Sequence, residues 1–318
     1  MRPAVKICLV IGAFIAVCAA GIFWRLHQVA ARKPEAVEAA PPVKNQMAAA
    51  RSRLASKPTP SPEMPANLPE RITPAFQADP SISERVKTVH ALGTTLSSKE
   101  ISALYAYLLT PGSPVAATRQ NENWLRNEML NQLAEQETLP SGLADVLLAI
   151  YQDPQQDVVM RDYAVQRMTP VYERASSEEK AALRQALWQA TGETDGSIAG
   201  TALLALQELA QTSEGLERNR VAETALQLAT DEQCGELSRI TAIQVCGQMG
   251  VNQAETLMLQ LAQNASSIPL RISAIAALGD LGSNQSETYL RQVAWNADAR
   301  LQLAAESALQ RLHKRRGT

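Results

Sequence analysis

Two segments of the chain that lie 32 residues apart decide the fold: RITAIQVCGQMGVNQAETLMLQLAQN (239–264) and RISAIAALGDLGSNQSETYLRQVAWN (271–296). They share Arg, Ile, Ala, Gly, Asn, Glu and Thr at equivalent places. Similarity at a fixed period of this length is typical of proteins built from repeated supersecondary units. The two segments therefore predict a domain of stacked repeats.

Each segment carries the local signals of one helix, a tight turn and a second helix. A glycine after an apolar periodic stretch predicts a left-handed residue at the end of a helix. Asn followed three residues later by Glu predicts an N-cap with a capping box. The residues expected in these roles are Gly250, Asn252 and Glu255 in the first segment, and Gly282, Asn284 and Glu287 in the second.

The pattern extends in both directions when one small or apolar position of the second helix is used as an anchor. Apolar residues recur one and four positions after each anchor, which gives the stripe of an amphipathic helix. Only in the last unit does a charge, Glu306, take the apolar place, as expected where no further repeat follows. The anchors are Met129, Ala164, Ala202, Ala242, Ala274 and Ala305.

The stretches YQDPQQDVVMRDYAVQRM (151–168) and SSIPLRISAIAALGDLG (266–282) resemble HEAT repeats. The resemblance extends over about 98–313, with an extra leading helix near 82–94. It implies an all-α fold, a right-handed α-solenoid of about six helix pairs whose second helices line a concave binding face. Arginines at the start of the second helix would link successive turns in this family; they appear as Arg126, Arg161, Arg239 and Arg271, whereas Ala199 and Gln302 replace them elsewhere.

The N-terminal part of the chain has a different composition. Residues 7–24 form an uncharged apolar run long enough to cross a bilayer as a helix, and they predict a transmembrane signal anchor after a short tail of residues 1–6. A cleaved signal peptide, and hence a secreted protein, is the alternative. The segment 25–80 is rich in proline and alanine and is expected to be a disordered linker.

We expect the repeat domain, residues 81–313, to lie on the exported side of the membrane and to end in a basic tail, residues 314–318. Residues 81–318 together carry a net charge of −7, against +5 for residues 1–80. An acidic body does not attract phosphate backbones, so nucleic acid is not an expected partner.

The sequence contains no recognisable catalytic or cofactor motif. His27, His90 and His313 show no metal-ligand spacing, and neither a phosphate-binding loop nor a nucleophile elbow is present. We therefore predict no metal, no cofactor and no catalytic residue. Cys234 and Cys246 are either free or joined in a disulfide.

The predicted function is that of a membrane-tethered scaffold that binds another protein or peptide; an enzyme or enzyme subunit of the lyase type that binds a small ligand is the alternative. Positions next to each anchor should line the concave face, and they are polar, amide-rich and acidic, which suits a basic partner. Trp188 and Trp295 occupy equivalent places on first helices, where the intervening unit has Gln263; they are either exposed contact residues or packed under a loop. The candidate contact residues are Glu128, Asn131, Tyr163, Gln166, Glu208, Gln244, Gln248, Asp280, Trp188 and Trp295.

Overall fold

The computed structural model describes residues 67–77, 80–112, 116–212, 218–296 and 298–317, and all regular secondary structure in these ranges is helical. The all-α prediction is thereby confirmed for this part of the chain. The helices are α3 (Thr73–Phe76), α4 (Ile82–His90), α5 (Ser98–Leu109), α6 (Ala116–Ala134), α7 (Leu143–Gln152), α8 (Val158–Arg174), α9 (Ser177–Ala190), α10 (Ile198–Thr212), α11 (Arg218–Thr230), α12 (Glu236–Met249), the short 3-10 helix η1 (Asn252–Ala254), α13 (Glu255–Asn264), α14 (Ile268–Leu281), α15 (Asn284–Asn296) and α16 (Ala299–Arg316).

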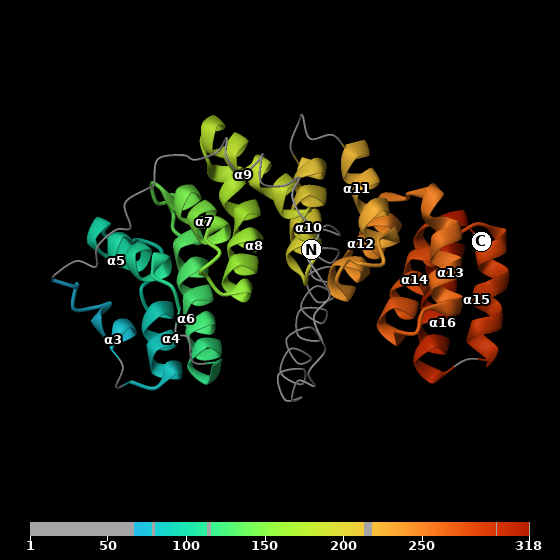
Figure 1. The fold of residues 1–318 in the computed structure, drawn as a ribbon, viewed down its shortest axis with the longest axis horizontal. Coiled ribbons are helices and arrows are strands. Elements are labelled where there is room, and N and C mark those ends of the chain that lie inside the picture. Colours follow the sequence, from blue (N-terminus) through green and yellow to red (C-terminus); the bar gives the residue numbers. More distant parts are fainter. Residues whose placement is uncertain (1–66, 78–79, 113–115, 213–217, 297, 318) are drawn as a thin grey trace, which may run out of the picture. The chain divides into compact units, whose positions relative to one another are not determined.

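The helices of the described domain form two rows, which Figure 1 shows side by side. The first-helix row consists of α5, α7, α9, α11, α13 and α15. The second-helix row consists of α4, α6, α8, α10, α12, α14 and α16, and each of these helices packs on the next one. Each second helix also packs on the first helix of its own pair. The described residues thus form six helix pairs preceded by a leading helix, as the repeat spacing predicts.

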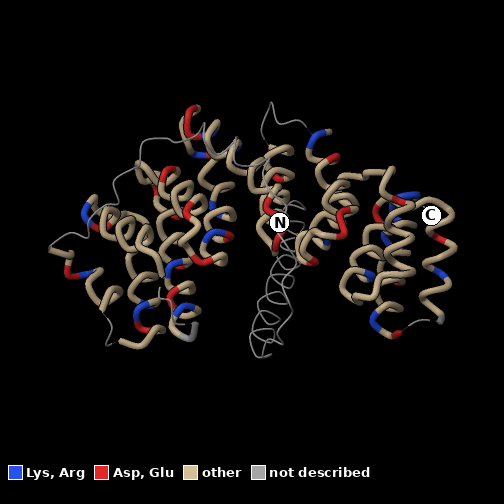
Figure 2. The backbone as a smooth tube through the Cα atoms, in the orientation of Figure 1, with Lys and Arg blue, Asp and Glu red and all other residues tan. Residues whose placement is uncertain are grey.

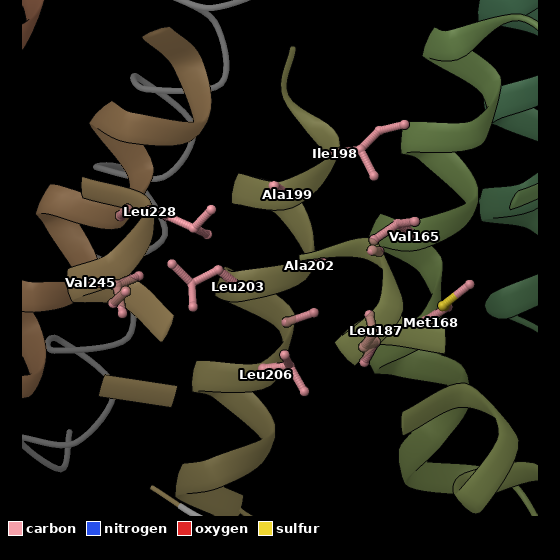
Figure 3. Close-up of a cluster of buried hydrophobic side chains, with 14 of the residues drawn as sticks. Val165, Met168, Leu187, Ile198, Ala199, Ala202, Leu203, Leu206, Leu228 and Val245 are labelled. Atoms are coloured by element: carbon pink, nitrogen blue, oxygen red, sulfur yellow. The ribbon is translucent and has the colours of Figure 1, made fainter. Parts of the chain in front are cut away.

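The core runs along the second-helix row. The small and apolar anchors, from Met129 to Ala305, are completely buried, and so are the residues that follow them in the stripe up to α14. Figure 3 shows Val165, Leu203 and Val245 on three successive second helices within one such cluster. Glu306, which departs from the apolar stripe, is exposed on α16. Cys234 and Cys246 are both free and buried.

Small residues allow neighbouring second helices to approach closely. At Gly247 an added Cβ would lie 3.0 Å from the Cα of Ala277, and at Gly279 it would lie 2.7 Å from the Cα of Ala308. At such distances a side chain at Gly279 would overlap its neighbour and one at Gly247 would fit only tightly, because protein interiors are close-packed. This explains why the core of a protein with so few aromatic residues can still be filled.

The two turn glycines serve different purposes. Gly250 has φ 66° and is left-handed, as predicted. Gly282 was expected to be left-handed too, and that expectation is wrong, since its φ is −65° and its ψ is 151°. A side chain at Gly282 would overlap the carbonyl oxygen of Leu278 and the Cβ of Ser286, so this glycine is required for space.

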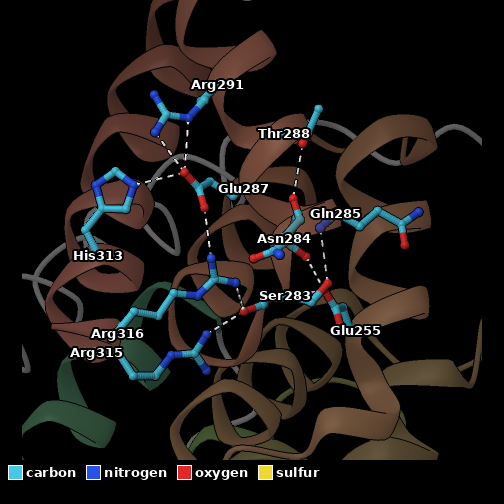
Figure 4. A network of polar contacts seen from close by, with 12 residues as sticks. Glu255, Ser283, Asn284, Gln285, Glu287, Thr288, Arg291, His313, Arg315 and Arg316 are labelled. Carbon is cyan, nitrogen blue, oxygen red and sulfur yellow. Dashed lines mark hydrogen bonds and ion pairs between the residues drawn. The ribbon is translucent and has the colours of Figure 1, made fainter. Parts of the chain in front are cut away.

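The predicted capping boxes at the last two turns are also wrong. Asn252 is the first residue of η1, and its side chain caps no helix. Asn284 is the first residue of α15, and Ser283 accepts the hydrogen bond from the backbone of Gln285 instead (3.2 Å). The carboxylate of Glu255 reaches the next pair, where it accepts hydrogen bonds from Ser283 N (2.6 Å) and Ser286 Oγ (2.5 Å), as Figure 4 shows for Ser283. It therefore links two repeats.

Glu287 on α15 is the repeat equivalent of Glu255, but it has different partners. Its carboxylate instead accepts hydrogen bonds from Arg291 (2.8 Å) and Arg316 (2.8 Å) and lies 3.2 Å from His313 Nε2 (Figure 4). Arg315 also donates to the carbonyl oxygen of Asp280. The basic end of the chain, predicted to be a tail from residue 314, is therefore part of α16 up to Arg316 and is bound to the preceding repeats.

On four second helices, an arginine near the start of the helix makes the same hydrogen bond. Its Nε donates to the carbonyl oxygen nine or ten residues earlier, at the end of the helix that precedes it. The expected link to the following pair exists for Arg161, which also binds Glu193 (2.8 Å), whereas the hydrogen bonds of Arg239 stay within its own pair. The shared contacts are Arg85 to Ala75 (2.9 Å), Arg161 to Tyr151 (2.7 Å), Arg239 to Ala229 (3.4 Å) and Arg271 to Ala262 (2.9 Å).

The contact of Arg85 shows that α3 and α4 are a shortened first repeat. Ile72 and Ala75 are completely buried against the domain, and Arg71 forms an ion pair with Glu100 (2.8 Å). The disordered linker predicted for 25–80 therefore extends too far toward the C-terminus. Among the described helices, none has both the length and the apolar character needed to cross a bilayer. The predicted anchor, residues 7–24, lies outside the described residues.

Candidate functional site

The candidate contact residues on second helices are distributed over α6, α8, α10, α12 and α14 and do not form one compact cluster. Every one of them is at least partly accessible to solvent, as expected for one face of the second-helix row. Gln166, Glu208 and Gln248 are exposed; Glu128, Asn131, Tyr163, Gln244 and Asp280 are half-buried.

Several of these side chains are already occupied by contacts within the domain. The Glu128 carboxylate lies 2.9 Å from His90 Nε2 and accepts a hydrogen bond from Asn131 Nδ2 (3.2 Å). Gln248 accepts one from Gln207 (2.9 Å). Asp280 binds Arg311 (2.8 Å). These residues are better described as links between neighbouring helices than as free contact positions.

An acidic pair on α8 and α10 is free of such contacts. Glu208 and Glu173 lie on neighbouring second helices, and within the described residues neither carboxylate has a hydrogen bond or an ion pair. Burial and the neighbouring charge of Glu173 together raise the pKa of Glu208. Arg174, the residue after Glu173, forms no ion pair with either carboxylate and donates instead to the carbonyl oxygens of Ala134 and Glu137, at and just after the end of α6. The sequence pointed to Glu208 but not to Glu173.

The two tryptophans differ. Trp295 on α15 is 83% exposed, the largest exposure among the large apolar side chains described. Trp188 on α9 is half-buried, and the guanidinium carbon of Arg220 on α11 lies 4.0 Å from the centre of its ring. Trp188 lines a cleft of about 560 Å³ between α9 and α11. Arg220 and the acidic residues Glu223 and Asp231, which also line it, were not singled out by the sequence, because nothing in α11 marks them as a site.

The described residues contain no group of three or more His, Cys, Asp or Glu side chains that could hold a metal ion. Figure 2 shows acidic and basic residues interspersed along the helices. The arrangement offers polar and charged surfaces for contact with another molecule.

Comparison with known proteins supports the repeat architecture. Residues 222–310 match the model of the family described as HEAT repeats. The described helices form a HEAT-like repeat domain. No curated protein sequence matches the chain.

Two solved structures are similar to the chain at low identity. Human deoxyhypusine hydroxylase in complex with glycerol is 16% identical, with a TM-score of 0.35; the match covers 77% of this chain and 95% of the hydroxylase. A designed armadillo repeat protein, YIII(Dq)4CqI, is 15% identical, with a TM-score of 0.38; the match covers 77% of this chain and all of the designed protein. Neither similarity carries information on function at these scores.

Proposed function

We propose that this protein is a non-catalytic scaffold, tethered to a membrane by residues 7–24, whose second-helix row binds another protein or a peptide. The observation that carries the proposal is the acidic pair Glu173 and Glu208, which is solvent-accessible and has no cationic partner within the described residues. Like charges on neighbouring helices weaken each other's ionised state, so a cation from a partner would relieve the repulsion. A basic segment of a protein therefore suits this face.

A pocket on the second-helix row is too small to enclose a small-molecule ligand. The pocket beside Gln207 and Gln248 has a volume of only about 20 Å³. Sites for small molecules usually enclose roughly 300–1,000 Å³. An enzyme or enzyme subunit of the lyase type would need such a cavity with convergent polar groups on this row.

Site-specific photo-cross-linking in intact cells tests the scaffold. A photoreactive residue is placed at Gln166, Glu208 or Gln244, and at the exposed first-row residues Gln260 and Gln292 as matched controls. We expect one defined protein to be captured from the second-row positions and not from the controls. The scaffold is refuted if two results are obtained together. No adduct forms, and a chain that carries Q166A, E208A and Q244A rescues the deletion phenotype as well as the unmodified chain does.

The tether and its orientation require a separate experiment. We propose that the repeat domain lies on the exported side, because single N-terminal anchors usually export the chain that follows them. A reporter that is active only after export is fused behind Thr318, and a second reporter that is active only in the cytoplasm serves as the control. Activity of the second reporter alone would contradict the exported orientation.

A further inference from the structure

The cleft between α9 and α11 lies on the first-helix row, and backbone contacts hold its two sides in place. The turns that follow these two helices are joined, because Gly235 N donates a hydrogen bond to Thr194 O (2.8 Å). A Cβ at Gly235 would lie only 2.7 Å from Gly196 N, so the two turns meet backbone to backbone. This contact fixes the distance between the two helix pairs at one end of the cleft. The space of about 560 Å³ is thus framed by a rigid contact.

One wall of the cleft carries a stacked aromatic–cation pair. The guanidinium of Arg220 covers the half-buried ring of Trp188 at 4.0 Å. Arg220 forms no ion pair with a carboxylate within the described ranges, so its exposed side chain is held by the ring. Trp and Arg are the residue types most enriched among the energetically dominant residues of protein interfaces. Leu228, which is buried, adds an apolar surface next to this pair.

The cleft also contains two carboxylates that lack a cationic partner. Glu223 is exposed and makes no hydrogen bond or ion pair with any described residue. Asp231 is exposed as well, and within the described residues its carboxylate accepts only the backbone N–H of Gln233 (2.9 Å). With Arg220 as the one cation among the residues that line it, the cleft has a net negative charge. It therefore favours a cationic group and disfavours an anionic one.

We propose that this cleft binds an extended segment of a partner polypeptide, whose lysine or arginine side chains meet the carboxylates of Glu223 and Asp231. The aliphatic part of such a side chain would lie along Leu228 and the edge of Trp188, while its charged end meets one of the two carboxylates. The side-chain amide of Gln227, also in the cleft, is available to the backbone of the segment. This surface belongs to the first-helix row and is distinct from the acidic pair on the second-helix row.

Fluorine NMR on the full chain tests the proposal directly. The chain contains four tryptophans. After labelling with 5-fluorotryptophan, the signal of Trp188 is assigned with the W188F variant. The probe is the acetylated, amidated peptide Gly-Arg-Gly-Arg-Gly, and the matched control peptide carries Glu in place of Arg. We expect the arginine peptide to shift the Trp188 signal in a saturable manner, while the glutamate peptide leaves it in place.

Charge-neutralising variants then test the contacts. Because a solvent-exposed ion pair usually changes an affinity by only roughly two- to fivefold, the double variant E223Q and D231N should weaken binding by about tenfold. The control E178Q and E236Q removes the same charge from exposed residues outside the cleft and should stay within about twofold of the unmodified chain. The proposal is overturned if the Trp188 signal does not respond, if both peptides shift it equally, or if the two double variants bind alike. None of these outcomes depends on cross-links formed at the second-helix row.

Discussion

Replacing Gly279 by alanine should force α14 and α16 apart. The new Cβ would lie 2.7 Å from the Cα and 2.8 Å from the carbonyl oxygen of Ala308, where ordinary contacts begin at 3.4 Å. Because the opposing atoms belong to the backbone, no side-chain rotation can relieve the overlap, and α16 must shift by about 0.7 Å. A shift of this size forfeits a quarter or more of the dispersion energy of the contacts between the two helices.

The expected cost follows from two opposing effects. Overpacking a core usually costs about 1–3 kcal/mol, whereas alanine in place of glycine within a helix gains about 1 kcal/mol. For Gly279 the steric cost should lie toward the upper end, which leaves a net loss of about 1–2 kcal/mol. Native-state hydrogen exchange of the amides of α16 measures this loss as a lower free energy of local opening.

The equivalent substitution at Gly247 provides the matched control. It occupies the same place in the preceding repeat and gains the same helix propensity, but its Cβ would lie 3.0 Å from the Cα of Ala277. A displacement of a few tenths of an ångström then suffices, and the net effect of G247A should be close to zero. The reasoning is refuted if G279A leaves the protection of α16 unchanged, or if G247A costs as much.

Three further outcomes are expected. Asn127 Oδ1 is buried without a hydrogen bond, and α12 and α14 have isoleucine at the equivalent repeat position. The substitution N127I should therefore raise the free energy of unfolding, measured by urea denaturation, by about 1 kcal/mol. A loss of stability would show that this oxygen is hydrated. Burial raises the pKa of Glu255, but hydrogen bonds from Ser283 and Ser286 outweigh it and leave the pKa below its ordinary value. Its contribution to stability is therefore complete above about pH 4.3 and is lost as the pH falls through the lowered pKa, and E255Q should show a smaller loss of stability between neutral and acidic pH. Burial raises the pKa of the Cys246 thiol to about 12, so in a C8S, C18S, C234S background a thiol reagent should modify this residue only after unfolding; rapid modification of the folded chain would contradict its burial.

The repeat core was predictable because it depends on local periodicity. An apolar residue every three or four positions marks the buried side of a helix whatever its neighbours are. The anchors and the stripe from Leu130 to Leu278 are buried as predicted, and Gly250 is left-handed. The exposure of Glu306 followed from its departure from the same pattern.

The polar links between repeats were not predictable in this way. The sequence around Glu255 has the spacing of a capping box, yet its carboxylate is closer to the donors of the next turn. At Glu287 the same spacing leads to another arrangement, because the basic end of α16 supplies the partners of its carboxylate. The short helix α3 was assigned to the linker, since four helical residues carry too little periodicity to be detected.

The sequence by itself determined the repeat period, the class of fold and the buried face of each second helix, since these depend on residues that are neighbours along one helix. Only the tertiary structure decided which polar groups meet across pairs. The stack of Arg220 on Trp188, the cleft beside it and the acidic pair of Glu173 and Glu208 each combine residues from two helices. Their geometry depends on the distance between successive pairs, which backbone contacts such as that between Gly235 and Gly196 set.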